Sequence, residues 1–257
     1  MMRAWIEWRG KQYWADLTRP ADLSVAMHPG GPRAWYVEPV SIEPVRMPGF
    51  VGAVEEGGSV NFNTIVFNPH GHGTHTESVG HITKDVLSVN HALRKSFFVT
   101  AIITVTPELI DKDRVITKEM VAAALPETCP EAVIIRTLPN DVSKLNRLYS
   151  GTNFPYLHVD AMRLLVSRGV DHFLTDLPSV DREEDGGALD AHRAFWMETP
   201  DRTHCTISEM VFVPDEVSDG LYLMNLQTAA FENDATPSRP VVFALKEFIQ
   251  GTAGSEK

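Results

Sequence analysis

The sequence predicts an α/β fold in one domain, with a mixed sheet and flanking helices. Three observations predict it. Strand-like and helix-like segments alternate through the middle of the chain, both ends are rich in strand-like segments, and no clear linker divides the chain. With 257 residues, 43% of them hydrophobic, the chain can bury a sizeable core. We therefore expect residues 1–257 to form a single domain.

The N-terminal part is expected to supply short strands and one irregular segment. Residues 4–16 are typical of a β-hairpin, because two β-prone runs flank a turn that contains glycine. Residues 28–39 are dense in proline and glycine, and Trp35 within them either lines a pocket or is buried for packing. Residues 60–67 form a strand-like run that leads directly into a histidine-rich segment.

The middle and the end of the chain alternate strands with helices. Residues 97–105 and 132–137 are apolar and β-branched, which is typical of central strands buried on both faces. Helices are expected over residues 83–87, 118–125, 160–168 and 188–197, and further strands over residues 170–176, 207–213, 220–226 and 241–245. The tail from Gly251 is expected to be disordered.

Composition and charge exclude several classes of partner. The formal net charge is −11 and no cluster of Lys and Arg interrupts it, so we expect neither nucleic acid nor an anionic membrane as a partner. No apolar run approaches the ~18 residues of a membrane span. Cys129 and Cys205 make no disulfide framework, which favours a reducing cytoplasm. Both are interpreted as buried structural thiols, with a zinc-ligand or nucleophile role left open.

The most informative segment is residues 70–81, which hold four of the ten histidines of the chain and one carboxylate. Imidazole and carboxylate groups are ligands for zinc, manganese and iron. If the segment is extended, His75 and Glu77 point to the same face, because side chains alternate along a strand. They could then bind one ion together. A solvated histidine-rich loop is the alternative interpretation.

Two downstream residues are weaker candidates for the same site. His192 lies in a short expected helix, where a lone histidine is more often a surface or capping residue. Glu209 lies inside an apolar strand, where an unpaired buried carboxylate is costly. Either metal coordination or a salt bridge to a cation such as Arg136 would offset that cost.

With these residues in place, the chain resembles the cyclase family, which includes the bacterial metal-dependent kynurenine formamidases. The loop of that family reads His-x-Gly-Thr-His-x-Asp-x-Pro-x-His, and the match here is Gly73-Thr74-His75, then Glu77, then His81. Residues 179–181, Ser-Val-Asp, are similar to a downstream segment of the family. The resemblance implies an α/β architecture with a swivelling β/β/α arrangement, usually in dimers or tetramers.

The resemblance also implies a site, carried over residue by residue. His75, Glu77, His192 and Glu209 would hold one or two divalent metal ions, with zinc or manganese expected. His81 would be the general acid/base.

The chain departs from the family pattern at several positions. The first histidine of the family aligns with Gly71, which cannot bind metal. We expect His70 to replace it, because His72 would point to the opposite face of a regular strand. Glu77 stands for the aspartate and Val79 for the proline.

The substrate pocket is expected to differ as well. The substrate-contacting tryptophan of the family falls near His28, so His28 and Trp35 are our candidates for substrate binding. A pocket for formylkynurenine is therefore not expected.

The leading hypothesis is a cytoplasmic, arylformamidase-like hydrolase of a small amide or a related acyl C–N or C–O bond. A divalent metal ion would lower the pKa of a bound water from ~16 toward ~7 and polarise the carbonyl. His81 would carry the proton, a contribution of typically ~10²–10⁴-fold. Two alternatives remain open. One is a non-catalytic paralogue that binds a small molecule or metal, and the other is a structural subunit whose histidine loop forms an interface.

Overall fold

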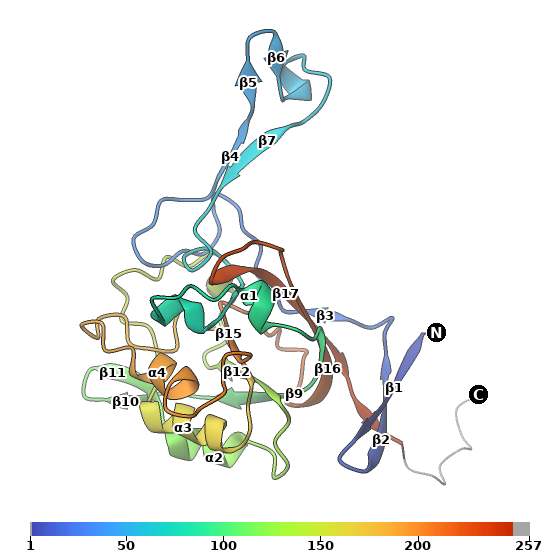
Figure 1. Ribbon diagram of the computed structural model, residues 1–257, viewed down its shortest axis with the longest axis vertical. Helices are drawn as coiled ribbons and strands as arrows, with labels where there is room; N and C mark the ends of the chain where they lie inside the picture. The colour runs from blue at the N-terminus through green and yellow to red at the C-terminus, as the bar shows by residue number, and fades with distance from the viewer. Residues whose placement is uncertain (1, 249–257) are drawn as a thin grey trace.

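A closed, barrel-like sheet of seven strands forms the centre of the molecule. The computed structural model describes residues 2–248, so the predicted tail from Gly251 lies outside the described residues (Figure 1). The seven strands follow the order β16-β9-β12-β14-β15-β8-β17, and the pairing of β17 with β16 closes the ring. Strand β3 (Ala21–Asp22) adds to β17 from outside. The remaining bounds are β8 (His75–Glu77), β9 (Phe97–Val105), β12 (Ala132–Thr137), β14 (His172–Thr175), β15 (Thr206–Glu209), β16 (Gly220–Thr228) and β17 (Ala235–Ala244).

The sheet is mixed, as the sequence predicts. Strands β9, β12, β14 and β15 run parallel, whereas β8 and β16 are antiparallel to their neighbours. Strand β15 ends at Glu209 rather than at residue 213, because Met210 adopts a left-handed backbone with φ 53°. Strand β17 begins six residues before the expected strand at 241, and residues 235–237 of this extension pair with β8.

Alternate residues of the central strands pack into two separate hydrophobic cores. On β12, Val133 and Ile135 pack toward the helices α2 (Lys118–Ala124), α3 (Val159–Ser167) and α4 (Asp190–Trp196). Ala132 and Ile134 pack in a second cluster with residues of β9, β14, β16 and β17, which lies inside the barrel. Figure 1 shows the three helices gathered on one side of the sheet. The strands are buried on both faces for this reason, which explains their continuous apolar sequences.

The helices begin at identifiable caps. Thr117 accepts a hydrogen bond from the Met120 backbone N–H at the start of α2, as the sequence predicts. The prediction of a helix at residues 83–87 is wrong. The structure places helix α1 at Val89–Ala92, where the Ser88 side chain accepts from Asn90 N. Short 3₁₀ segments lie at Val54–Glu56, Val79–Ile82 and Val142–Leu145.

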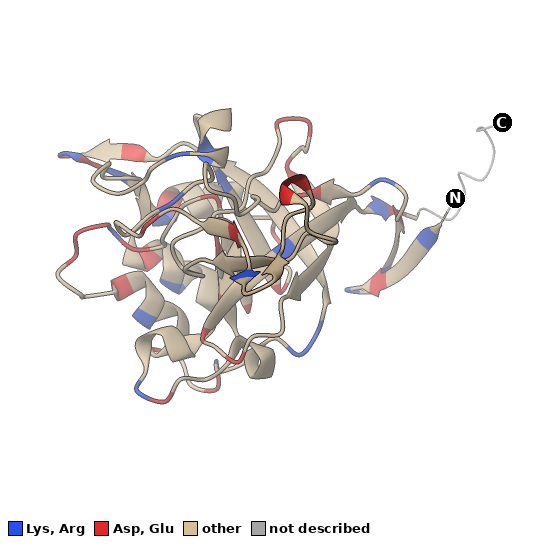
Figure 2. Ribbon diagram, turned by 90° about the horizontal axis from the view of Figure 1, so that it is seen from above, with Lys and Arg blue, Asp and Glu red and all other residues tan. Residues whose placement is uncertain are grey.

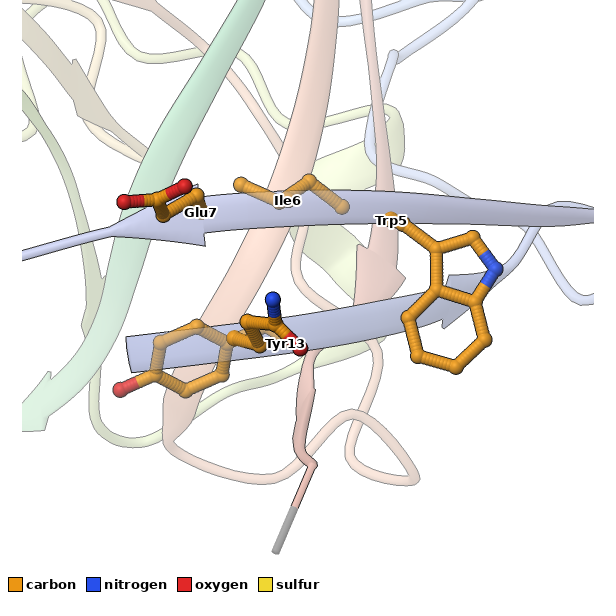
Figure 3. Close-up of a pocket in the computed structure, with 5 residues that line it drawn as sticks. Trp5, Ile6, Glu7 and Tyr13 are labelled. Atoms are coloured by element: carbon orange, nitrogen blue, oxygen red, sulfur yellow. The ribbon is translucent and has the colours of Figure 1, made fainter. Parts of the chain in front are cut away.

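Smaller sheets surround the barrel. The N-terminal hairpin, β1 (Arg3–Trp8) and β2 (Lys11–Asp16), pairs with β18 (Lys246–Glu247). A cavity of about 300 Å³ lies beside this hairpin, between side chains of its two strands (Figure 3). It is lined by Trp5, Ile6, Glu7, Gln12 and Tyr13, so it contains none of the candidate site residues. A three-stranded sheet joins β10 (Glu108–Ile110), β11 (Asp113–Ile116) and β13 (Tyr156–Leu157).

A two-stranded arm projects from the body (Figure 1). Its stem pairs β4 (Ser41–Pro44) with β7 (Asn63–Val66), and its tip holds β5 (Arg46–Met47) and β6 (Phe50–Val51). The arm exposes a set of large apolar side chains, namely Ile42, Met47, Val54, Val60, Phe62, Ile65 and Val66. Its second strand leads directly into the histidine-rich segment.

The distribution of charged residues and the hydropathy of the helices add two observations. Figure 2 shows Lys and Arg scattered over several elements among Asp and Glu. Within residues 2–248, no helix has the length and apolar character needed to cross a membrane.

Candidate metal centre

Strands β8 and β15 place three acidic or imidazole side chains on one face of the sheet. His75 lies opposite Glu209 in the antiparallel register, and Glu77 lies opposite Ile207, which packs in the core on the helix side. Thr76 points to the other face, where its Oγ1 lies 2.7 Å from Ser208 Oγ. The alternation expected from an extended segment therefore brings His75, Glu77 and Glu209 together on the helix side, all of them buried.

Among residues 2–248, no Lys or Arg side chain pairs with Glu209. It accepts a hydrogen bond from Val180 N at 2.9 Å, and its Oε2 lies 3.4 Å from His75 Nε2. Arg136 instead pairs with Asp219 at 3.0 Å and donates to backbone carbonyls. Of the two explanations for a buried Glu209, the salt bridge to Arg136 is therefore wrong.

His192 reaches the same face from helix α4. Asp181 accepts hydrogen bonds from the backbone N–H groups of Ala191 and His192, so it caps the helix from a distant loop. The same carboxylate contacts His192 Nδ1. His192 Nε2 is thereby directed at Glu77, with 3.0 Å between it and Oε1.

The structure distinguishes the two histidines that flank Gly71. His72 Nε2 lies 2.8 Å from the backbone oxygen of Glu38 and its Nδ1 accepts from Asn68 N, so this ring faces away from Glu77. His70 Nδ1 lies 3.1 Å from Glu77 Oε2. His70 therefore occupies the place next to the other candidate ligands.

His81 completes the group from the 3₁₀ segment Val79–Ile82. Its ring stacks on His70 with the ring centroids 4.1 Å apart, and its Nε2 lies 3.9 Å from Glu77 Oε2. Its side chain is 30% exposed, whereas Glu77 and His75 are closed off from solvent. His81 is therefore positioned at the boundary between the buried group and solvent.

Sequence reasoning missed Asp234. Its Oδ2 lies 2.8 Å from His70 Nε2 and 3.4 Å from His81 Nδ1. Nothing in the local sequence distinguishes it from Glu232, which is exposed. The pairing of β17 with β8, which sets Ala235 opposite Glu77, is what brings Asp234 to the site.

The electrostatics show that the site demands positive charge. Burial by itself would lower the pKa of His70, but the Asp234 hydrogen bond and the nearby Glu77 carboxylate raise that pKa to about 10. Burial opposes the charged form of His192 as well, yet contacts with Asp181 and Glu77 raise its pKa. Burial would raise the pKa of Glu77, but the neighbouring imidazoles hold it well below its usual range. The carboxylates thus favour positive charge at His70 and His192, which a divalent cation could supply in place of their protons.

Two orphaned atoms test whether a metal fits. His75 Nε2 and Glu77 Oε2 are buried and make no hydrogen bond, although carboxylate and imidazole neighbours lie within ion-pair distance. Unsatisfied buried polar atoms are rare and call for an explanation. Two sets of potential ligands share Glu77, one with His70 and His81 and the other with His75 and Glu209. Imidazole and carboxylate donors in this arrangement suit a borderline divalent cation.

A third group of potential ligands, Asp171, His204 and Cys205, fits a metal less well. Arg202 Nη1 lies 3.4 Å from Asp171 Oδ1, so a guanidinium already neutralises this carboxylate. Burial raises the pKa of the Cys205 thiol to about 12, which keeps it protonated at neutral pH. Burial also raises the pKa of Cys129. Both cysteines are free and buried, as expected for structural thiols.

The two expected substrate-binding residues lie on the segment beside the histidine loop. Ala34 N donates to Gly71 O at 3.0 Å, so residues 28–39 run along the loop. Trp35 is 36% exposed and makes an edge contact with Phe154, and the exposed His28 accepts from Gly30 N. Within residues 2–248, neither side chain makes a hydrogen bond or a ring contact with the metal-centre residues.

A second cavity, of about 450 Å³, is lined by residues that neighbour the site in sequence, although no metal-centre side chain is among its lining residues. Pro69 and Asn233 in its lining directly precede His70 and Asp234 in the chain. Phe67 and Phe231 supply its aromatic surface, with their ring centroids 6.0 Å apart. Its volume lies within the ~300–1,000 Å³ typical of small-molecule sites.

Comparison with known proteins gives one family and one fold. A family model described as "Putative cyclase" matches residues 16–182. Solved structures with a similar fold include a potential metal-dependent hydrolase with cyclase activity, at 18% identity and a TM-score of 0.63, covering 88% of this chain and 98% of the other. Isatin hydrolase A from Labrenzia aggregata, bound to benzyl benzoate, is 17% identical with a TM-score of 0.63. The match covers 88% of this chain and 93% of the other. An isatin hydrolase bound to the product analogue thioisatinate is 15% identical with a TM-score of 0.57. The match covers 88% of this chain and 92% of the other.

Proposed function

We propose, from the premise that this chain belongs to the cyclase family, that it is a metal-dependent hydrolase of a small amide or a related acyl C–N or C–O bond. The observation that carries the proposal is the convergence of His75 Nε2 and Glu77 Oε2, buried and without hydrogen bonds, on one face of the sheet. Four histidines and two glutamates from three stretches of the chain, namely residues 70–81, helix α4 and strand β15, meet there. Such a donor set has no evident structural purpose without a cation.

The geometry supports a particular set of ligands. His70, His75, Glu77 and Glu209, which belong to the two sets of potential ligands that share Glu77, would hold one or two divalent ions, zinc or manganese. His192, whose Nε2 lies 3.0 Å from Glu77 Oε1, would be a further ligand. When bound, such an ion supplies an acidified water molecule and a Lewis acid for a carbonyl. The protein contributes orientation. Asp181 holds the His192 ring, and the Val180 backbone N–H holds Glu209.

Proton transfer is assigned to His81. Its partly exposed ring can accept a proton from the attacking water, donate it to the leaving group and exchange it with solvent. Imidazole is the side chain most often used as both a general acid and a general base. The stacked His70 ring limits the orientations that the His81 ring can adopt.

The cavity of about 450 Å³ supports a substrate with an apolar, planar body. Phe67 and Phe231 offer aromatic surfaces, while Asn233 and Glu232 provide polar groups at the lining. The isatin hydrolases of similar fold act on a cyclic amide, which is the kind of bond proposed here. His28 and Trp35 remain candidates for closing the pocket from the neighbouring segment.

Metal analysis and a substrate panel test the proposal. Wild-type protein purified without a tag or chelator should contain about one or two ions per chain, measured by elemental analysis. The double variant His75→Ala/Glu77→Ala should lose them. Wild type should also turn over at least one member of a panel of amides, lactams, esters and lactones. A wild type that binds no zinc or manganese even after incubation would contradict the proposal.

A non-catalytic paralogue is the second candidate, because the chain lacks the first histidine of the family pattern at Gly71. It predicts that wild type binds metal or a small molecule and hydrolyses nothing in the panel. Retained metal with no turnover would favour this candidate over the hydrolase.

A further inference from the structure

Asp234 contacts both a candidate metal ligand and the candidate proton carrier. Its Oδ2 lies 2.8 Å from His70 Nε2 and 3.4 Å from His81 Nδ1. The side chain is 17% exposed, so these contacts are largely shielded from solvent. Among the carboxylates at the site, Asp234 lies on the outer side of the two stacked rings, away from Glu77.

The backbone holds Asp234 in this place. Its carbonyl accepts a hydrogen bond from Ser78 N at 2.9 Å, and the next residue, Ala235, pairs with Glu77 in the sheet. The backbone of Asp234 is therefore tied to β8, which fixes the point from which its side chain reaches His70. This rigidity is what an orienting group needs.

The arrangement repeats a feature found at His192. There, Asp181 contacts Nδ1 and leaves Nε2 directed at Glu77 Oε1. At His70, Asp234 contacts Nε2 and leaves Nδ1 directed at Glu77 Oε2. Metal-binding histidines commonly donate the ring N–H that faces away from the metal to a carboxylate. The two pairs thus present one free imidazole nitrogen each to opposite oxygens of Glu77.

We infer that Asp234 is a positioning residue that makes His70 a metal ligand and aligns His81 against it. The inference rests on the proposed function, because it assumes a cation beside Glu77. It explains how His70, one residue before Gly71, can act as a metal ligand in place of the family histidine that aligns with Gly71. A ring that arrives from a displaced backbone position needs its own partner to set its orientation, and Asp234 provides it.

Substitution of Asp234, with a matched control, tests the inference. In Asp234→Asn the amide can donate as well as accept, so it no longer dictates which ring nitrogen of His70 faces Glu77. We expect zinc affinity, measured by chelator competition, to fall by about 10–100-fold. The visible spectrum of the cobalt-loaded protein should change as well. Asp234→Glu should restore part of the affinity.

Asp22→Asn is the control, because it is the same chemical change at an aspartate that pairs with Arg239 at 2.7 Å and belongs to neither the metal centre nor the cavity. It should match wild type in affinity and spectrum. All variants should share the circular dichroism of wild type, which separates positioning from loss of fold. Wild-type zinc affinity and an unchanged cobalt spectrum in Asp234→Asn would overturn the inference.

Failure of the inference is distinguishable from failure of the proposed function. If wild type binds zinc without hydrolysing any substrate, while Asp234→Asn binds it more weakly, the hydrolase proposal fails and the inference stands. If wild type is an active hydrolase and Asp234→Asn is unchanged in affinity, the inference alone fails. Crystal structures of the metal-free proteins add a readout that is independent of activity, because the His70 ring should turn away from Glu77 only in Asp234→Asn.

Discussion

His192 Nε2 lies 3.0 Å from Glu77 Oε1, although 115 residues separate the two in sequence. The contact joins helix α4 to strand β8, and Asp181 holds the opposite side of the same imidazole. A carboxylate, a histidine and a second carboxylate thus lie in line. This order is typical of a metal site in which the central histidine is oriented from behind, with Glu77 on the side of the ion.

Replacing Asp181 tests this orientation. Asp181→Asn keeps the side-chain shape but removes the charge that contacts His192 Nδ1. We expect metal affinity to fall by about 10–100-fold in a chelator competition. Asp181 accepts from the backbone N–H groups of Ala191 and His192 through different oxygens, and asparagine has only one acceptor oxygen, so stability should also fall by ~1 kcal/mol in urea denaturation. Unchanged affinity together with reduced stability would leave Asp181 as a helix cap and nothing more.

His81→Ala should separate catalysis from metal binding. His81 Nε2 lies 3.9 Å from Glu77 Oε2, further than the ring nitrogens of His70 and His192 lie from that carboxylate. We expect turnover to fall ~10²–10⁴-fold while metal content, measured by elemental analysis, stays close to that of wild type. Equal losses of metal and turnover would show that His81 is a ligand instead.

Gly73 is expected to be essential for the loop that carries His75. Its φ is +62°, and a Cβ added there would lie 2.8 Å from the Val25 backbone oxygen. Gly73→Ala should therefore lower the free energy of unfolding by ~2–4 kcal/mol, combining left-handed strain with a clash. Gly49→Ala is the matched control, because Gly49 has φ +76° and open space, so only ~1 kcal/mol is expected. Urea denaturation measures both, and equal losses would refute the clash.

His172 should make stability depend on pH, outside the metal centre. Burial lowers its pKa to about 4, and its Nδ1 lies 2.9 Å from Thr206 Oγ1. The unfolded chain binds a proton below pH ~6.5 that the folded protein excludes, so stability falls as the pH drops from about 6.5 toward 4. Between pH 7 and 5, wild type should lose ~2 kcal/mol more than His172→Gln in urea denaturation. Parallel pH profiles would contradict this prediction.

The exposed arm leads to a proposal about assembly. A two-stranded ribbon is marginally stable alone, and this one exposes Phe62 and Ile65, each more than half accessible. We propose that copies of this chain associate through the arm as dimers or tetramers. Light scattering should show the mass of a dimer or tetramer for wild type. The double variant Phe62→Ser/Ile65→Ser should have a lower mass, whereas Glu43→Gln on the same ribbon should keep the wild-type mass. A monomeric wild type would contradict the proposal.

The local part of the site could be predicted from the sequence. Alternation along a strand is a property of the backbone, so His75 and Glu77 had to share a face once residues 75–77 were extended. The cost of burying a carboxylate likewise marked Glu209 as a residue that needs a partner. The buried strands at residues 97–105 and 132–137 follow from their apolar, β-branched sequences in the same way.

What only the tertiary structure decided are the contacts between distant segments. Whether His70 or His72 faces Glu77 depends on the turn at Gly71 and on Glu38, which accepts the His72 hydrogen bond. The role of Asp234 depends on barrel closure, because the pairing of β17 with β8 sets its position while its own sequence context resembles any acidic turn. Local patterns carry the direction of a side chain along its element. They carry no information about which element the fold places opposite. The metal centre depends on contacts between such distant elements.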